Sequence, residues 1–173
     1  MLIDYEADIN AKNPNGATAL MIATSNRDLE VLKLLIASGA EINAKNNEGY
    51  TALMAAAYRD YYESVKFFLS LGADVSAKDI TGRTALIEVM NDLNYISIFD
   101  GIKTIKLLIS SGAEVNLKAL DKGIWTSRNE ECYRTPLMMA VNYNKNFYNA
   151  KVGESAGTLQ QREVRQERCT SFR

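Results

Sequence analysis

Carboxylates are the side chains in this chain whose spacing could first suggest chemistry. Asp8, Glu41, Asp74 and Glu114 recur along the sequence, and two carboxylates that share a concave cleft can serve as the acid and base of a hydrolase. Each of these residues, however, stands in the same position of a phrase that returns at a nearly fixed step. A position that returns with a period favours a structural role over a catalytic one.

The other residue types needed for catalysis are missing or badly spaced. The chain contains no histidine, so neither a Ser-His nor a Cys-His nucleophile can form. Cys132 and Cys169 lie far apart and form no paired metal motif, and we interpret them as reduced thiols. No Gly-rich phosphate loop with its lysine is present. The sequence therefore predicts a protein that is not an enzyme and binds no metal or cofactor.

A four-residue phrase recurs at a step that defines the architecture. Thr18–Met21 is followed by Thr51–Met54 and Thr84–Ile87, two steps of 33 residues (51 − 18 and 84 − 51), and Thr135–Met138 follows after 51 residues (135 − 84). A second phrase, Gly39–Asn43, returns as Gly72–Ser76 after the same 33 residues (72 − 39) and as Gly112–Asn116 after 40 (112 − 72), because the third unit carries an insertion. Two phrases with one period predict a repeat array in place of a domain with one central core.

In their order these phrases resemble the ankyrin repeat family. Each unit has an Asp or Asn opening, a Gly three residues later, a Thr-x-Leu helix start, a Leu-Leu-type second helix and a Gly-Ala-x-x-Asn exit over roughly residues 1–147. The resemblance implies an all-α solenoid of stacked helix-turn-helix units with projecting β-turn fingers. One departure is that Met21, Met54, Ile87 and Met138 stand where the family usually has His, so the hydrogen bond of that His is absent.

The period divides the chain into six expected segments. These are the end of a partial repeat at 1–12, repeats at 13–45 and 46–78, a repeat with an insertion at 79–118, a partial repeat with a long loop at 119–150, and a tail at 151–173. We expect the tail to be disordered because it has few apolar residues. A foreign or frame-shifted tail and a truncated gene product are further interpretations. Because neither end shows the capping repeat that an array needs, we expect a fragment of a longer array.

Three local expectations follow from the repeated unit. The Thr that opens each first phrase should cap a helix with its hydroxyl, an interaction worth about 1 kcal/mol. The Gly that opens each exit phrase should adopt a left-handed conformation just past a helix end. The apolar stripe at 29–36 is too wide for a lone surface helix and should be buried between stacked repeats.

Two insertions interrupt the period, and each allows two interpretations. Leu93–Phe99 is either a helix extension folded onto the adjacent repeat or an exposed apolar contact patch. The segment near Lys122–Tyr133, which carries Trp125, either anchors a long loop against the stack or contacts a partner. By contrast, Phe67 and Phe68 take the positions of Leu34 and Leu35 one period earlier, so core packing is preferred there over an aromatic ligand box.

The resemblance implies that the fingers and the inner faces of the first helices bind a protein partner. Tyr50, Tyr58, Arg59 and Arg83 are the leading candidates, because Tyr and Arg are enriched among residues that dominate interface energy. The further candidates are Asn47, Glu48, Asn91, Asp92 and Trp125. The alternative is that all of these are ordinary solvated finger residues.

Composition narrows the possible partners without identifying one. A net charge of −1 gives no reason to expect nucleic acid or an anionic membrane, and no apolar run is long enough for a transmembrane helix. We expect a cytoplasmic, monomeric scaffold, although the sequence does not distinguish this location from export as an effector. The alternatives are a regulatory or structural segment of a larger polypeptide that acts in cis, or self-association through uncapped ends.

Overall fold

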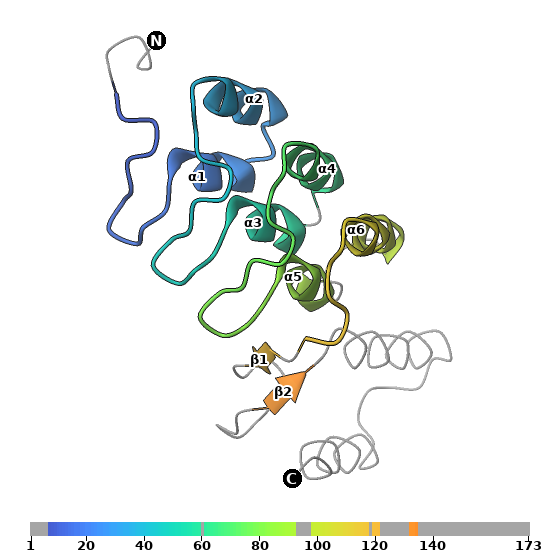
Figure 1. Ribbon diagram of the computed structural model, residues 1–173. Coiled ribbons are helices and arrows are strands. Elements are labelled where there is room, and N and C mark those ends of the chain that lie inside the picture. Colours follow the sequence, from blue (N-terminus) through green and yellow to red (C-terminus); the bar gives the residue numbers. More distant parts are fainter. Residues whose placement is uncertain (1–6, 60, 93–97, 118, 122–131, 135–173) are drawn as a thin grey trace, which may run out of the picture.

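The computed structural model describes residues 7–59, 61–92, 98–117, 119–121 and 132–134, and within them the side chains of 7–59, 61–90 and 101–117. In this part of the chain six helices form two parallel rows (Figure 1). The inner row consists of α1 (Ala19–Ser25), α3 (Ala52–Tyr58) and α5 (Ala85–Asp92). The outer row consists of α2 (Leu29–Ala37), α4 (Tyr62–Ser70) and α6 (Ile98–Ser110). The expected all-α solenoid is confirmed.

Three loops project side by side in front of the inner row and form the fingers (Figure 1). Each finger is closed in the same way by one side chain. Asn46 Oδ1 accepts hydrogen bonds from the backbone N–H groups of Glu48 and Tyr50 at 2.9 and 2.8 Å, and the Asn46 N–H donates to the Tyr50 carbonyl at 3.0 Å. Asn13 and Asp79 make the equivalent bonds in the other two fingers. An Asx turn therefore sets the shape of every described finger.

The inner helices begin at the expected threonines, but only one of the three described hydroxyls acts as a cap. Thr51 Oγ1 accepts from the Met54 N–H at 3.2 Å. The buried hydroxyls of Thr18 and Thr84 make no hydrogen bond, so the cap predicted at these two positions is wrong. The two helices start there through backbone bonds, from the Ile22 N–H to the Thr18 carbonyl at 3.2 Å and from the Glu88 N–H to the Thr84 carbonyl at 3.0 Å.

The outer helices end at the predicted glycines. Gly39, Gly72 and Gly112 have φ values of 90°, 82° and 94°, which confirms the left-handed conformation. After α2 the Ala40 N–H donates to the Leu35 carbonyl at 3.0 Å. This bond gives a hydrogen-bond donor to one of the last carbonyls of the helix, which has no partner within the helix.

One continuous core runs between the two rows through all three described repeats. Its largest buried side chains include Leu20, Leu53 and Leu86 from the inner row and Leu32, Val65, Phe68 and Leu108 from the outer row. The complete burial of Phe68 confirms core packing. Met21, Met54 and Ile87 are also buried, so the positions where the family usually has His are apolar core positions in this chain.

The apolar stripe of α2 departs from expectation. Leu32 and Leu35 are buried, but Val31 and Leu34 are exposed. The prediction that the whole stripe is buried is therefore wrong for these two residues. α2 is the first helix of the outer row and has a described outer-row neighbour, α4, on one side only (Figure 1).

The two insertions are described in part. Ile98 and Phe99 belong to α6, which has 13 residues where α2 and α4 have nine each, so this end of the first insertion extends a helix. In the second, β1 (Ala119–Asp121) pairs antiparallel with β2 (Cys132–Arg134), two short strands that the sequence did not lead us to expect. Residues 93–97, Trp125 and the tail at 151–173 lie outside the described residues.

Within the described part of the chain, no helix combines the length and the apolar character needed to cross a membrane.

Candidate functional site

Tyr50 lies at the base of the second finger. The charged groups near it are Asp79 and Arg83 of the third finger and Glu88 of α5. Its side chain is half-buried, and its hydroxyl donates to the Met54 carbonyl at 3.3 Å. Burial, followed by the effect of the nearby Glu88 carboxylate, raises the pKa of Tyr50 well above its ordinary value, and Arg83 and Tyr58 also influence this hydroxyl. Three of the four leading candidates, Tyr50, Tyr58 and Arg83, therefore lie close together.

Arg83 links the third finger to α5. Its guanidinium contacts the Asp79 carboxylate at 2.9 Å through Nη2 and the Glu88 carboxylate at 3.3 Å through Nε. Both carboxylates are almost completely buried. Burial acts to lower the pKa of Arg83, but Glu88 and Asp79 outweigh it and raise that pKa. Removing one member of such a buried group leaves a charge without its partner, so Arg83 holds the finger in place.

Asp79 is the centre of this arrangement. Burial alone would raise its pKa, but hydrogen bonds from the Thr81 hydroxyl at 2.7 Å and from the backbone N–H groups of Arg83 and Thr81 outweigh burial and lower it. Asp79 is therefore ionised at neutral pH. It closes the Asx turn with one oxygen and pairs with Arg83 through the other.

Tyr58 and Arg59 form the exposed part of this surface. They stand at the end of α3, and both side chains are exposed. The Arg59 guanidinium lies over the Tyr58 ring, 5.8 Å from its centroid, a distance at which a cation and an aromatic face attract each other. No carboxylate among the described residues forms an ion pair with Arg59. Its hydrogen-bond donors are thus available to a partner.

The tips of the fingers are tied to one another. The Asn47 side chain donates from Nδ2 to the Pro14 carbonyl at 2.9 Å, and the Asn47 backbone N–H donates to the Asn15 carbonyl at 3.1 Å. The Ile80 N–H donates to the Glu48 carbonyl at 2.8 Å. These bonds fix the spacing of the tips, while the side chains of Glu48 and Ile80 remain exposed.

Ile80 belongs to the finger positions of the third repeat, but it was not among the leading contacts selected from the sequence. Its side chain is 69% exposed, which makes it the most exposed large apolar residue in the described chain. An apolar residue at a fingertip position, where the first and second fingers have Pro14 and Asn47, was a signal that the sequence offered. Of the remaining candidates, Asn91 and Asp92 form the last turn of α5, where the backbone alone is described, and Trp125 lies outside the described residues.

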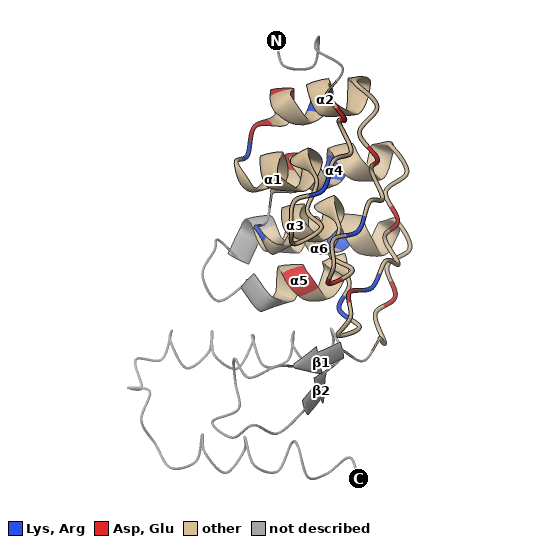
Figure 2. Ribbon diagram, turned by 90° about the vertical axis from the view of Figure 1, so that its left-hand side faces the viewer, with Lys and Arg blue, Asp and Glu red and all other residues tan. Residues whose placement is uncertain are grey.

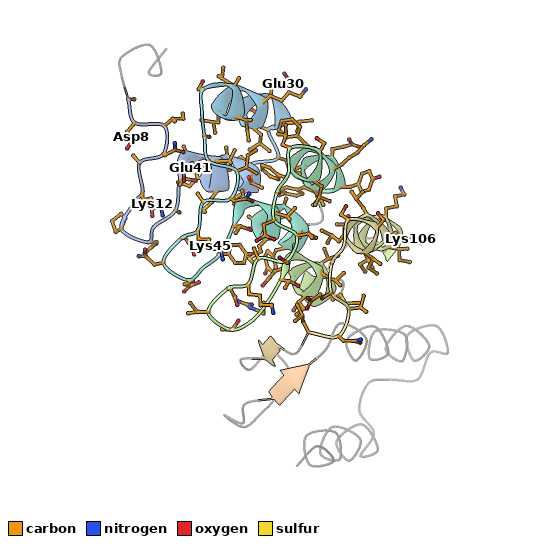
Figure 3. All side chains as sticks on the ribbon, viewed as in Figure 1. Asp8, Lys12, Glu30, Glu41, Lys45 and Lys106 are labelled. Carbon is orange, nitrogen blue, oxygen red and sulfur yellow. The ribbon has the colours of Figure 1, made fainter. Side chains whose placement is uncertain are left out.

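Acidic and basic residues both occur along the loop edge of the stack (Figure 2). Lys12 donates from Nζ to the Lys45 carbonyl at 2.9 Å, across one period (Figure 3). Asp8 and Asp74 accept from backbone N–H groups two residues further on, each at 2.9 Å. These recurring acids therefore complete turns, as their periodicity predicted.

A solenoid of helix pairs with tied fingers is a repeat architecture built for surface recognition. Residues 1–79 match the family model for ankyrin repeats (3 copies). Residues 1–79 are thus similar to ankyrin repeats, and α5 and α6 continue the same stack beyond the matched residues. No curated protein matches the chain.

The family allows a general statement about function. Ankyrin repeats are generally protein–protein interaction modules, and ankyrin repeat proteins are typically non-catalytic scaffolds.

Proposed function

We propose that this chain is a non-catalytic scaffold that binds a protein partner on one surface. We call it the finger–α3 surface, and it consists of Asn47, Glu48, Tyr58, Arg59 and Ile80. The observation that carries the proposal is the contrast between exposed recognition side chains and a backbone held by hydrogen bonds. Tyr and Arg are typical anchors of interfaces, and Ile80 adds exposed apolar area beside them.

The rigidity of the fingers supports this proposal energetically. A loop that becomes ordered only on binding loses conformational entropy, and that loss subtracts from the affinity. Here the bonds of Asn47 to the first finger and of Ile80 to the second hold the tips before any partner arrives. The surface is therefore pre-organised for binding.

Tyr50 and Arg83 receive a different role in this proposal. Tyr50 directs its hydroxyl to the Met54 carbonyl, and Arg83 is occupied by two buried carboxylates. Both residues support the surface from beneath. We keep Asn91, Asp92 and Trp125 as proposed contacts further along the stack, and a cytoplasmic location remains part of the proposal.

The proposal is tested by photo-crosslinking from single positions. A photoreactive amino acid is placed at Ile80, at Tyr58 and, as a control, at Leu71, which is on the outer row and is exposed to about the same extent as Tyr58. We expect Ile80 and Tyr58 to capture the same protein and Leu71 to capture none of it. Equal capture from Leu71 would place the contact outside the finger–α3 surface and contradict the proposal.

A second candidate function is that of a regulatory or structural segment that acts through the end of the stack. It is favoured by one observation, the exposure of Val31 and Leu34 on α2. In that case the contact would be made in cis or between copies, on a different face from the finger–α3 surface.

A further inference from the structure

Arg27 has an unusual backbone conformation for a residue with a long side chain. It follows α1 with a φ of 61°, and it is the one non-glycine residue with a positive φ in the described part of the chain. This conformation disfavours residues that have a Cβ. A residue that keeps it in spite of this strain points to a role for its side chain.

The side chain of Arg27 reaches across to the second repeat. Its Cζ lies 4.1 Å from the centroid of the Tyr61 ring, inside the range of about 6 Å at which a cation is attracted to an aromatic face. The Tyr61 hydroxyl donates in the opposite direction, to the Ser25 carbonyl at 3.4 Å. The Tyr61 ring is therefore held against the first repeat, and it restricts where the Arg27 guanidinium can lie.

Arg59 makes a similar contact within the second repeat. Its guanidinium lies over the Tyr58 ring, and Tyr61 follows two positions later (61 − 59). The turn from α1 to α2 and the end of α3 lie on the same side of the stack, opposite the fingers (Figure 2). We call these four residues, Arg27, Tyr58, Arg59 and Tyr61, the arginine edge.

Both guanidinium groups of the arginine edge can bind an anion. Arg27 and Arg59 are exposed, and no carboxylate of the described residues forms an ion pair with either of them. Asp28, the acid next to Arg27 in the sequence, accepts from the Val31 N–H at 3.1 Å and caps α2. A guanidinium over a ring still has its N–H donors, which match the two oxygens of a carboxylate.

We propose that the arginine edge binds an acidic segment of the protein partner, with one carboxylate on each arginine. This inference rests on the proposed function and adds the chemistry of the partner, because Tyr58 and Arg59 also belong to the finger–α3 surface. Each guanidinium lies over a ring of its own. The edge therefore offers two separate single charges, which suit two acidic side chains along one segment.

The first test is the binding of a fluorescein-labelled peptide of alternating Glu and Gly, followed by fluorescence anisotropy with the full chain. A peptide of the same length with Gln in place of Glu is its control. We expect the native chain to prefer the Glu peptide, with an affinity that falls as salt is added. Arg27→Gln and Arg59→Gln should each weaken this binding about fivefold, the upper range for an exposed ion pair. A native chain that does not prefer the Glu peptide would overturn the proposal.

Lys66→Gln is the matched control variant. It removes one positive charge from an exposed residue of α4, so the net charge changes as it does in the two arginine variants. Lys66→Gln should bind the Glu peptide like the native chain, and circular dichroism checks that every variant is folded. An equal loss of binding in Lys66→Gln would show that the peptide responds to net charge alone, which would overturn the arginine edge.

Arg27→Gly separates a binding role from a structural one. Glycine adopts a positive φ without strain, so this variant should resist urea at least as well as the native chain. It should also bind the Glu peptide about fivefold more weakly, because the exposed charge is lost. A variant that is less stable and yet binds the peptide as tightly as the native chain would give Arg27 a structural role and contradict the proposal.

Photo-crosslinking from Ile80 distinguishes the failure of this inference from the failure of the proposed function. We expect Arg27→Gln to reduce the amount of protein that Ile80 captures. Undiminished capture would overturn the arginine edge and leave the finger–α3 surface as the binding site. A native chain that binds the Glu peptide but captures no protein from Ile80 would contradict the proposed function alone.

Discussion

At the scale of single residues, the turns of this protein depend on side chains and backbone conformations that few other residues could replace. Gly72 follows α4 with a φ of 82°, and a Cβ added there would meet no atom within 4 Å. A substitution at this position is therefore strained by its backbone conformation alone. Gly16 differs, because a Cβ there would lie 2.4 Å from Asn47 Oδ1 and would push the first two fingers apart.

We predict that Gly72→Val lowers the free energy of unfolding by about 1–2 kcal/mol, the usual cost of a left-handed conformation in residues with a Cβ. Gly72→Asn should lose less, since Asn tolerates this conformation. Urea denaturation of the native chain and the two variants measures both differences. Equal stability of the native chain and the valine variant would contradict the conformation assigned to Gly72.

The link between Asp79 and Arg83 predicts a dependence of stability on pH. The folded state lowers the pKa of Asp79 below its ordinary value of 3.8. The carboxylate therefore contributes stability that is fully present above about pH 4 and is lost as the pH falls through the lower folded value.

Asp79→Asn tests this link with little disturbance of the finger, because Asn13 and Asn46 close the other two fingers. We predict that Asp79→Asn lowers the free energy of unfolding at neutral pH by about 1.5–3 kcal/mol, the range for a hydrogen bond to a charged group. The difference from the native chain should shrink below about pH 4. A difference that stays constant from pH 7 to pH 3 would show that the charge of Asp79 does not stabilise the fold.

At the scale of elements, asparagine side chains join successive exit loops at one edge of the stack. Asn10 Oδ1 accepts from the Glu41 N–H at 2.8 Å, and Asn43 Oδ1 accepts from the Asp74 N–H at 2.8 Å. One period later Ser76 stands in place of Asn. Its shorter side chain bonds within its own loop, from Oγ to Asp74 Oδ1 at 2.6 Å. The joint from the second to the third repeat therefore lacks this bridge.

We predict that Ser76→Asn installs the missing bridge to the Glu114 N–H and adds about 1 kcal/mol of stability. Hydrogen exchange of the Glu114 amide should slow about fivefold, the factor that corresponds to this free energy. Ser76→Ala, which carries no group able to bridge, is the control. If the asparagine and alanine variants exchange at the same rate, the bridge does not form.

The period of the sequence was sufficient to predict the helix pairs, the terminal glycines and the buried position of Phe68. These features depend on local chemistry that every repeat reproduces. The contacts of Arg83 with the buried Asp79 and Glu88 could not be predicted in the same way, because neither acid stands at one of the positions where an acid recurs with the period. The exposure of Val31 could not be predicted from the sequence either, because it depends on the position of α2 in the array.

At the scale of the whole molecule, the stack combines side chains from neighbouring repeats in one surface. The finger–α3 surface has an ordered backbone and exposed Tyr58, Arg59 and Ile80, which suits the recognition of a different protein. In a linear stack each repeat contacts only its neighbours, so such a surface extends along the row of fingers.

The most direct measurement is affinity capture from lysate of the producing cells with three forms of the chain. The first is native, the second carries Glu48→Ala, Tyr58→Ala and Ile80→Ala, and the third carries Lys66→Ala, Ser70→Ala and Leu71→Ala on the exposed side of α4. We predict that the native chain and the third form retain the same partner, and that the second form is folded but loses it. Equal retention by all three forms would contradict the finger–α3 surface as the binding site.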